Sequence, residues 1–383
     1  MAFGKKTKPE NGKECFSVPQ TYKNTHPYFG LGNIHPSPKT NFKLYTQLRE
    51  GVPVIDAAIM KLVRLIGSFE VECFDKRAQY ELDSFLQNIK VGSTSVGIKA
   101  FISVFFEQLL TYGTAVGEMV TDQNGISALY NADLACLELS HSKNPLETVV
   151  SVDNGFGTYT PIKYQNLLLV SALNPVPESA WGTSILKGLP FISDILLKIY
   201  NTIGTNWERI GNIRYAVTYK PQNDSADRTV SRQRAKEVAE QWGKTMQPSG
   251  PVKDFVAVGD VNIKVIGADN QIIDSEIPVR QMLEQIIAKL GIPPFLLGLN
   301  WSSTERMSSQ QADILTSELE YYRDVLNQVI RKICRTFLAF KGYDCGFSID
   351  WNSITLQDSL QQAQADYYSA QAKSIGKKIS QEE

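Results

Sequence analysis

The residues that most often carry enzyme chemistry are few in this chain, and they are not spaced for a shared site. Among 383 residues there are three histidines, His26, His35 and His141, all in loop-like sequence. No two of them are four residues apart, the spacing at which a helix presents a pair of metal ligands, and HExxH is absent. The sequence therefore predicts no metal site and no catalytic residue.

Glycine-rich loops that could hold a cofactor are equally weak. The stretch Gly30-Leu-Gly-Asn-Ile-His35 imitates half of a dinucleotide-binding fingerprint, but it lacks the third glycine and follows no strand. Neither GxxxxGK[ST] nor GxSxG occurs, and Gly155-Phe-Gly157 is better explained as a hairpin turn. We predict no cofactor. An enzyme with an unrecognised site stays open as an alternative.

Composition limits the remaining classes. The charged fraction of 21% and the net charge of −1 argue against a strongly basic nucleic-acid binder. Five cysteines are scattered, never at CxxC spacing, which favours free thiols in a reducing compartment: Cys15, Cys73, Cys136, Cys334 and Cys345. The basic, polar start is not a signal peptide, and no apolar run is long enough to span a membrane. We expect a cytoplasmic protein without a membrane partner.

The elements that would have to position any site are dominated by two helices, between Asp274 and Phe340. The first, Asp274–Leu290, is followed by Gly291-Ile-Pro-Pro-Phe-Leu-Leu-Gly298. A glycine suits the left-handed residue that ends a helix, and proline cannot continue one, because its N–H is missing and its ring clashes. The sequence therefore predicts a rigid structural elbow carried by Gly291, Pro293, Pro294 and Gly298.

The second helix is predicted over Glu305–Phe340, with Ser302 and Glu305 at capping-box spacing. At ~1.5 Å per residue it would be roughly 50 Å long. Its apolar stripe alternates steps of four and three, as a long packed helix requires. The stripe consists of Leu315, Leu319, Tyr322, Leu326, Val329, Ile333 and Phe337.

The N-terminal half predicts an α+β domain after an irregular, basic arm. Residues 1–50 are rich in lysine, proline, glycine and asparagine and contain no obvious element. Helices are predicted over 54–69, 81–89 and 96–112, a strand over 69–73, a strand–turn–strand over 112–129, and further short strands up to residue 172.

A compact insert, 211–272, separates two helical segments that could run out and back as a stalk. The first is predicted over Ile185–Ile210, opened or kinked by Pro190, and the second is Asp274–Leu290. Within the insert we expect a strand over 213–219, a charged helix over 231–246, and a hairpin of 255–258 with 261–266. A strand over 347–351 and a polar helix over 355–373 follow the long helix.

Taken in order, these segments resemble those of the portal (head–tail connector) proteins of tailed bacteriophages, over roughly 45–383. Trp181-Gly-Thr-Ser-Ile-Leu186 opens a long helix, and Leu109-Leu-Thr-Tyr-Gly-Thr-Ala-Val-Gly-Glu118 resembles the helix-to-strand segment of that family. Leu290–Gly298 looks like its most recognisable motif, and a Ser/Thr-rich loop then leads into Glu305–Phe340.

The resemblance implies an α+β portal fold with the following parts. These are an irregular basic arm (1–44), an α/β wing (45–184), a first stem helix (185–210), a small α/β clip (211–272), a second stem helix (273–291), a wing return with the tunnel loop (292–305), the tunnel helix with a further wing return (306–352), and a C-terminal helix or short crown (353–383). Many portals continue into a longer helical crown, so the crown here is short or truncated.

The resemblance also implies a function and partners. The chain would be one subunit of a ring, expected to be a dodecamer, that forms the DNA channel at a unique capsid vertex. It would serve packaging, ejection and tail attachment, and would meet double-stranded DNA, the terminase large subunit, the head–tail adaptor, and the major capsid and scaffolding proteins. The channel-facing residues would be Asn300, Trp301, Ser302, Ser303, Thr304, Glu305 and Arg306. A different phage structural or adaptor protein with a helical core stays open as the first alternative.

Overall fold

A computed structural model describes most of the chain. The residues described are 38–123, 125–142, 144, 146–155, 157–177, 179–211, 214–219, 233, 236–237, 240, 261–266, 274–299 and 305–354. The predicted arm up to 37, most of the charged helix over 231–246, and the C-terminal helix over 355–373 lie outside these residues.

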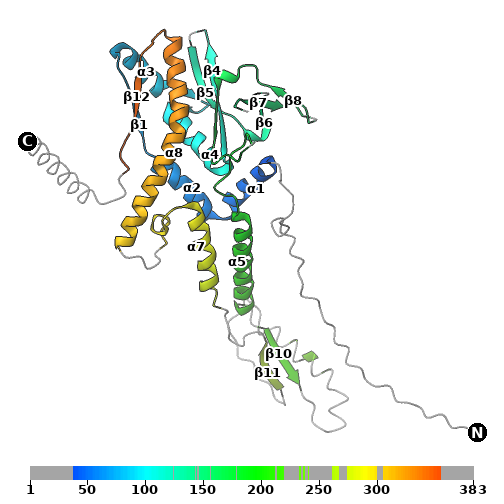
Figure 1. Ribbon diagram of the computed structural model, residues 1–383. Coiled ribbons are helices and arrows are strands. Elements are labelled where there is room, and N and C mark those ends of the chain that lie inside the picture. Colours follow the sequence, from blue (N-terminus) through cyan, green and yellow to red (C-terminus); the bar gives the residue numbers. More distant parts are fainter. Residues whose placement is uncertain are drawn as a thin grey trace, which may run out of the picture. The chain divides into compact units, whose positions relative to one another are not determined.

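The described residues contain seven α-helices, which Figure 1 labels. They are α1 (Pro38–Gly51), α2 (Pro53–Leu65), α3 (Lys76–Asn88), α4 (Ile98–Tyr112), α5 (Leu189–Gly211), α7 (Glu276–Leu290) and α8 (Glu305–Phe340). Short 3₁₀ helices are η1 (Leu134–Cys136), η2 (Gln165–Leu167) and η3 (Pro294–Leu297).

The strands of the described residues form four sheets. A five-stranded sheet has the order β3-β2-β5-β4-β9, in which only β2 and β5 run parallel. The others are a three-stranded sheet, β6-β7-β8, and the pairs β1-β12 and β10-β11. The strands are β1 (Phe69–Cys73), β2 (Lys90–Val91), β3 (Ser95–Val96), β4 (Thr114–Asp122), β5 (Gly125–Asn131), β6 (Leu137–His141), β7 (Thr148–Asp153), β8 (Tyr159–Pro161), β9 (Leu168–Ala172), β10 (Arg214–Tyr219), β11 (Val261–Ile266) and β12 (Phe347–Trp351).

The core forms where α2, α4 and α8 meet the sheets. Most of α4 is buried, with Phe101, Phe105 and Phe106 fully enclosed, while Ser103 and Val104 form a narrow exposed strip in its middle. The long helix α8 has the bounds predicted from the sequence, and all seven residues of its predicted apolar stripe are buried. It packs against α3, β5 and β9.

The prediction of an irregular segment up to residue 50 was wrong for 38–50, which forms most of α1. Its inner stripe is Phe42, Tyr45 and Leu48, three buried side chains at successive steps of three. The surrounding lysines and asparagine hide this period in the sequence. Burial of the stripe, at roughly 25 cal/mol per Å² of apolar surface, outweighs the weak local propensity.

Other helix boundaries shifted by a few residues for local reasons. Helix α3 begins before residue 81 because the Asp75 carboxylate accepts the N–H of Arg77 at 2.8 Å and caps it there. Helix α4 begins after residue 96 because Gly97 has φ 87°, which breaks the helical backbone. Helix α2 ends at Leu65, ahead of Gly67 with φ 82°.

The helix predicted from Ile185 begins at Leu189. Gly188 has φ 93°, outside the helical range, and Pro190 is then the second residue, where its missing N–H costs nothing. Helices α5 and α7 pack side by side (Figure 1). They are antiparallel, because Leu189 at the start of α5 and Leu290 at the end of α7 are both buried in the main core.

Beyond α5, β10 and β11 form an antiparallel pair, with Arg214 opposite Ile266 and Tyr219 opposite Val261. The hairpin predicted for β11 used 255–258 as its partner. That segment lies outside the described residues, and the partner in the structure is β10. Strand β12 has its predicted bounds and pairs with β1, so the segment after α8 returns to the N-terminal part of the core.

Candidate functional site

The predicted channel-facing residues are only partly described. Asn300 to Thr304 lie outside the described residues, so the structure does not test whether they form one site. Glu305 is the first residue of α8, and Arg306, the second, is exposed. What the structure does describe is the frame that holds both ends of this loop.

The elbow before the loop has the geometry predicted from its glycines and prolines. Gly291 ends α7 with φ 68°, and its N–H donates to the Ile287 carbonyl at 3.0 Å. Pro293 is extended, Pro294 opens η3, and Gly298 closes it with φ 75°. A Cβ at either glycine would meet nothing within 4 Å, so both are required for their backbone angles and not for space.

The elbow is fixed to the rest of the core. Ile292 is buried, and Leu296 and Leu297 of η3 pack against the main hydrophobic cluster. Helix α2 is the neighbour of both α7 and η3. The turn between α7 and the loop therefore rests on a packed surface.

Two segments that carried the sequence resemblance meet directly. Gly113, which ends α4, and Gly182 are so close that a Cβ on Gly182 would collide with the Gly113 carbonyl oxygen and lie 2.6 Å from the Leu173 nitrogen. The Gly182 N–H donates to the Thr114 hydroxyl at 2.8 Å, and the Ser184 hydroxyl donates to the Thr111 carbonyl at 2.6 Å. This junction has room for the backbone of both glycines but not for a Cβ on either of them.

A buried arginine anchors α8. The Arg323 guanidinium donates to the Ile66 carbonyl at 3.0 and 2.8 Å and to the Asn352 carbonyl at 2.8 Å. It also lies over the Trp351 ring, 5.0 Å from the centroid. Burial lowers the pKa of Arg323, opposed by the charge of Glu320. Three elements, α8, the end of α2 and the end of β12, are joined at this one side chain.

Two further polar contacts fix the C-terminal half of α8. The ammonium of Lys332 donates to the Leu168 carbonyl of β9, and burial lowers the pKa of Lys332. The Trp351 indole N–H donates to the Asn327 side-chain oxygen at 2.8 Å. Together with Arg323, these contacts hold α8 in one orientation.

The opposite face of α8 is solvent-exposed and separates its charges by sign. Exposed acidic residues occupy the middle of the helix, and exposed basic residues follow in the last third. The acidic residues are Asp313, Glu318, Glu320 and Asp324, and the basic residues of the last third are Arg331, Lys332 and Arg335, while Arg306 is exposed at the start of the helix. Apolar side chains are exposed on α8 as well: Met307, Ile314, Tyr321 and Phe340 are between 45% and 66% exposed.

The α5–α7 pair has a different surface. Its buried residues lie at one end, and apolar side chains become more exposed towards the other. On α5, Leu197 is 40% exposed, Tyr200 44% and Trp207 61%, and on α7 Ile277 is 62% exposed. Trp207 and Ile277 are exposed although they continue the apolar period of their helices, because a two-helix pair cannot enclose apolar side chains on both of its faces.

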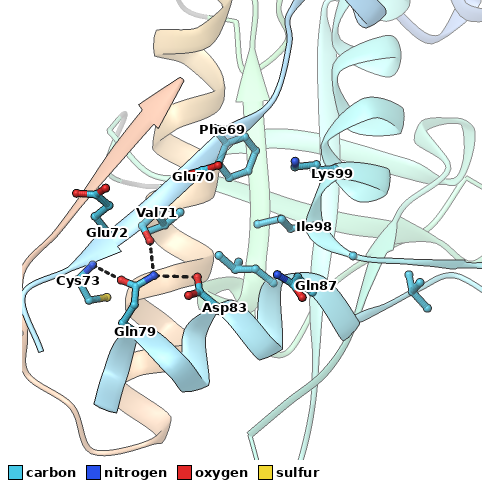
Figure 2. Close-up of a pocket in the computed structure, with 13 residues that line it drawn as sticks. Phe69, Glu70, Val71, Glu72, Cys73, Gln79, Asp83, Gln87, Ile98 and Lys99 are labelled. Atoms are coloured by element: carbon cyan, nitrogen blue, oxygen red, sulfur yellow. Dashed lines mark hydrogen bonds between the residues drawn. The ribbon is translucent and has the colours of Figure 1, made fainter. Parts of the chain in front are cut away.

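A pocket of about 790 Å³ lies between β1, α3 and the start of α4 (Figure 2). Gln79 stands in its wall: its amide oxygen accepts the Cys73 N–H, and its amide nitrogen donates to the Val71 carbonyl and the Asp83 carboxylate, each at 2.8 Å. Gln79 therefore occupies part of the outer edge of β1, where another strand could otherwise pair.

Metal-binding groups of three or more ligands are absent from the residues that the structure describes. His141 is exposed at the end of β6, while His26 and His35 lie outside those residues. Among the described helices, none is both long and apolar enough to cross a membrane.

In fold, the chain is similar to subunits of particle necks. The neck of the empty gene transfer agent (GTA) particle, computed with C6 symmetry, matches with a TM-score of 0.66 and 12% identity over 91% of this chain and 93% of that one. The neck of the native GTA particle, computed with C12 symmetry, matches with a TM-score of 0.64 and 12% identity over 89% and 91%. No protein-family profile and no curated protein matches the sequence.

A crystal structure of an HK97-family phage portal protein from Corynebacterium diphtheriae also matches, with 9% identity over 71% of this chain and 84% of that one. Its TM-score of 0.42 is too low to establish a shared fold by itself. The neck structures match almost from end to end, so the resemblance to head–tail connectors predicted from the sequence is confirmed as a likeness of fold.

Sequence reasoning missed Arg323, Gln79 and the Gly113–Gly182 contact. Arg323 had a detectable signal, because it is four residues after Leu319 and three before Leu326, on the buried side of the helix. Gln79 had none, since its role depends on where β1 happens to end. The two glycines were inside recognised motifs, but their contact joins residues 69 positions apart.

Proposed function

We propose that this chain is a portal subunit, a structural protein whose copies form a ring around a DNA channel at a unique capsid vertex. One observation carries the proposal: the order and packing of the elements are similar to those of neck subunits over about nine-tenths of both chains. Two of those neck structures were computed with C6 and C12 symmetry, which supports a ring, and a dodecamer in particular.

The proposed parts follow the elements. The wing comprises α1 to β9, which extends its start from 45 back to Pro38 because α1 packs with α2 and α4. Helices α5 and α7 are the antiparallel stem, and the insert that holds β10 and β11 is the clip. Helix α8 is the tunnel helix, β12 belongs to the wing return, and 353–383 is assigned to a C-terminal helix or to a crown that is short or truncated.

The tunnel loop, Asn300 to Arg306, is proposed to face DNA. Each phosphate contact made by lysine or arginine strengthens binding, and many such contacts would slow a sliding duplex. Small hydroxyl groups such as Ser302, Ser303 and Thr304 hold phosphate weakly. The near-zero net charge of −1 is consistent with a channel that lets DNA pass.

The remaining partners follow from the position of a portal in the particle. The clip would dock the terminase large subunit during packaging and the head–tail adaptor afterwards. The wing and crown would face the major capsid and scaffolding proteins. Assembly would take place in the cytoplasm of a bacterial host, and the finished ring would remain in the virion through DNA ejection.

Native mass spectrometry of the purified full chain tests the proposal, with negative-stain images of the same sample. We expect a mass of about twelve chains and a ring with a central hole. A monomer or dimer at micromolar concentration, with no ring in the images, would reject a portal and favour the alternatives of a different structural protein or an enzyme.

The loop assignment needs its own test. Residues 300–304 are replaced by a Gly/Ser linker of equal length, and packaging and DNA retention are measured in particles. We expect ring assembly to be unchanged and retention to fall. Unchanged packaging and retention would count against the loop as the DNA contact while leaving the ring proposal intact.

A further inference from the structure

Two cysteine side chains lie together where β1 and β12 leave their ladder. Cys73, the last residue of β1, pairs with Phe347, the first of β12. The Phe74 N–H donates to the Gly346 carbonyl at 3.2 Å and carries the pairing one residue further. Because residues two apart on an extended strand share a face, Cys345 is the diagonal neighbour of Cys73.

The two thiols share one environment. Both half-buried side chains pack against the main core cluster, and Cys345 is near enough to affect the pKa of Cys73. Burial, and then the nearness of Cys345, raises the pKa of Cys73 to about 11. At neutral pH the Cys73 thiol is therefore held in the protonated, slowly reacting form.

One of the thiols is reachable from solvent. Cys73 lines the pocket between β1, α3 and α4 (Figure 2), whose volume of about 790 Å³ admits a small molecule. The backbone of Cys73 is held there by Gln79. Cys345 lies in the connection between α8 and β12, which contains Gly342 with φ 78°, and it has no strand partner to hold it.

We propose that Cys73 and Cys345 form a site of reversible disulfide bonding within one chain, oxidised by a small-molecule disulfide such as oxidised glutathione. Diagonal neighbours on a strand ladder have Cα atoms about 7–8 Å apart, and the two residues of a disulfide at most about 6.8 Å, so the backbone must close by about 1 Å. The connection that carries Cys345 supplies this movement, because Gln79 keeps Cys73 in place.

The reaction has two thiol–disulfide exchanges. The Cys73 thiolate attacks glutathione disulfide, which forms a Cys73–glutathione bond and releases one glutathione thiolate. The Cys345 thiolate then attacks the Cys73 sulfur, which forms the Cys73–Cys345 bond and releases the second glutathione. The two protons lost by the cysteines go to the two glutathione thiolates, so two thiols are oxidised and one disulfide is reduced.

The groups around Cys73 set the pH dependence of this reaction. Cys345 faces it from the β12 side, and Asp83 and Asp75 from α3 and its cap, and these three raise the pKa of Cys73 further after burial. Cys334 lies near it on α8, where Cys73 in turn raises the pKa of Cys334. Lys99 also lines the pocket, from α4. Because the pKa of Cys73 is about 11, we expect the oxidation rate to rise about tenfold per pH unit between pH 7 and 9.

The bond would have a structural consequence. It would connect the strand before α3 to the strand after α8, and so close the C-terminal end of α8 onto the N-terminal part of the core. Under the reducing conditions of a cytoplasm the thiols stay free, and the bond forms when the protein meets an oxidising medium.

The test incubates the full chain with oxidised glutathione at pH 8, blocks residual thiols, and maps peptides without reduction. We expect a linked Cys73–Cys345 peptide, a chain that still migrates as a monomer on a denaturing gel, and a rise of a few degrees in Tm that dithiothreitol reverses. Cys136→Ser, which removes an exposed cysteine, should behave like the wild type.

Cys73→Ser and Cys345→Ser should each abolish the linked peptide and the reversible Tm shift, with an unchanged Tm in dithiothreitol as the check on folding. The wild-type peptide map stands even if a variant folds poorly. A Cys73–Cys334 link, a link between two chains, or only glutathione adducts would each overturn the proposal, as would no reaction at pH 9.

Discussion

Helix α8 and the α5–α7 pair are both long and amphipathic, but they meet the rest of the molecule in opposite ways. The inner stripe of α8 is buried along the helix, and Arg323 and Lys332 anchor it through carbonyl oxygens, while its outer face carries charged residues together with exposed Ile314 and Tyr321. The α5–α7 pair is buried at one end only, and side chains such as Tyr200 and Trp207 stay exposed.

The difference lies in how much of each helix the same chain covers. Both regions expose apolar side chains, so exposure alone does not separate them. One face of α8 is buried along most of its length, whereas α5 and α7 lose their cover away from the core. In the proposed ring, the next copy of the chain would cover α5 and α7.

The largest expected effect is at the junction of Gly113 and Gly182, where backbone packs directly against backbone. Gly182→Ala places a methyl group against the Gly113 carbonyl and the Leu173 backbone, so two segments of backbone must separate. We expect the free energy of unfolding to fall by about 4 kcal/mol or more, measured by urea denaturation.

Gly204→Ala is the matched control on α5, where a Cβ meets nothing within 4 Å. Because alanine favours a helix over glycine, this change should raise stability by about 0.5–1 kcal/mol. A similar loss in both variants would contradict the distinction between the tightly packed Gly113–Gly182 junction and the open surface of α5.

The next effect tests the α8 anchor. Arg323→Ala removes the donor to the Ile66 carbonyl, in a buried contact, and to the Asn352 carbonyl, and we expect a loss of about 2–4 kcal/mol in urea denaturation. Arg331→Ala, on the exposed face of the same helix, should change stability by less than about 0.5 kcal/mol. Equal effects would mean that Arg323 is not an anchor.

Alkaline pH should lower the free energy of unfolding through Cys334, a buried residue of α8. Burial raises the pKa of this thiol from 9.0 to about 12, so the unfolded chain loses the proton first. Stability is full below about pH 9 and falls as pH rises towards 12, by about 1.4 kcal/mol between pH 8 and 10. Urea denaturation of Cys334→Ala should lack this part of the pH dependence, and an identical slope would refute the assignment.

The smallest effect on the stability of a single chain is expected for the exposed surface of the α5–α7 pair. Tyr200→Ser removes an apolar side chain that is 44% exposed, so the unfolding of the isolated chain should change by less than about 0.5 kcal/mol. Self-association, followed by sedimentation velocity, should nevertheless weaken. Asn201→Ser, a polar change at the neighbouring exposed position, should leave association unchanged.

Much of the structure of α8 and of the elbow before it could be predicted from the sequence, for reasons that differ between regions. The stripe of α8 and the angles of Gly291 and Gly298 were predicted correctly because local period and backbone chemistry decide them. Helix α1 was missed because only tertiary burial reveals its inner face. The exposure of Trp207 could not be predicted, because a helical period identifies an apolar face without saying whether the same chain covers it.

In the candidate site, too, some features could be predicted from the sequence and others could not. The elbow could be predicted, since glycine and proline constrain the chain locally. The contacts of Arg323 could not, because they depend on where α2 and β12 end, far away in sequence. The β10–β11 pairing was missed because the two strands are separated by a long insert.

The most direct test of the account is a cryo-electron microscopy reconstruction of the purified full chain without imposed symmetry. We predict a closed ring with a continuous central hole, in which the α5–α7 pairs of adjacent copies contact one another and the exposed face of α8 borders the lumen. A closed particle without a lumen, or a ring in which α5 and α7 touch no neighbouring copy, would contradict it.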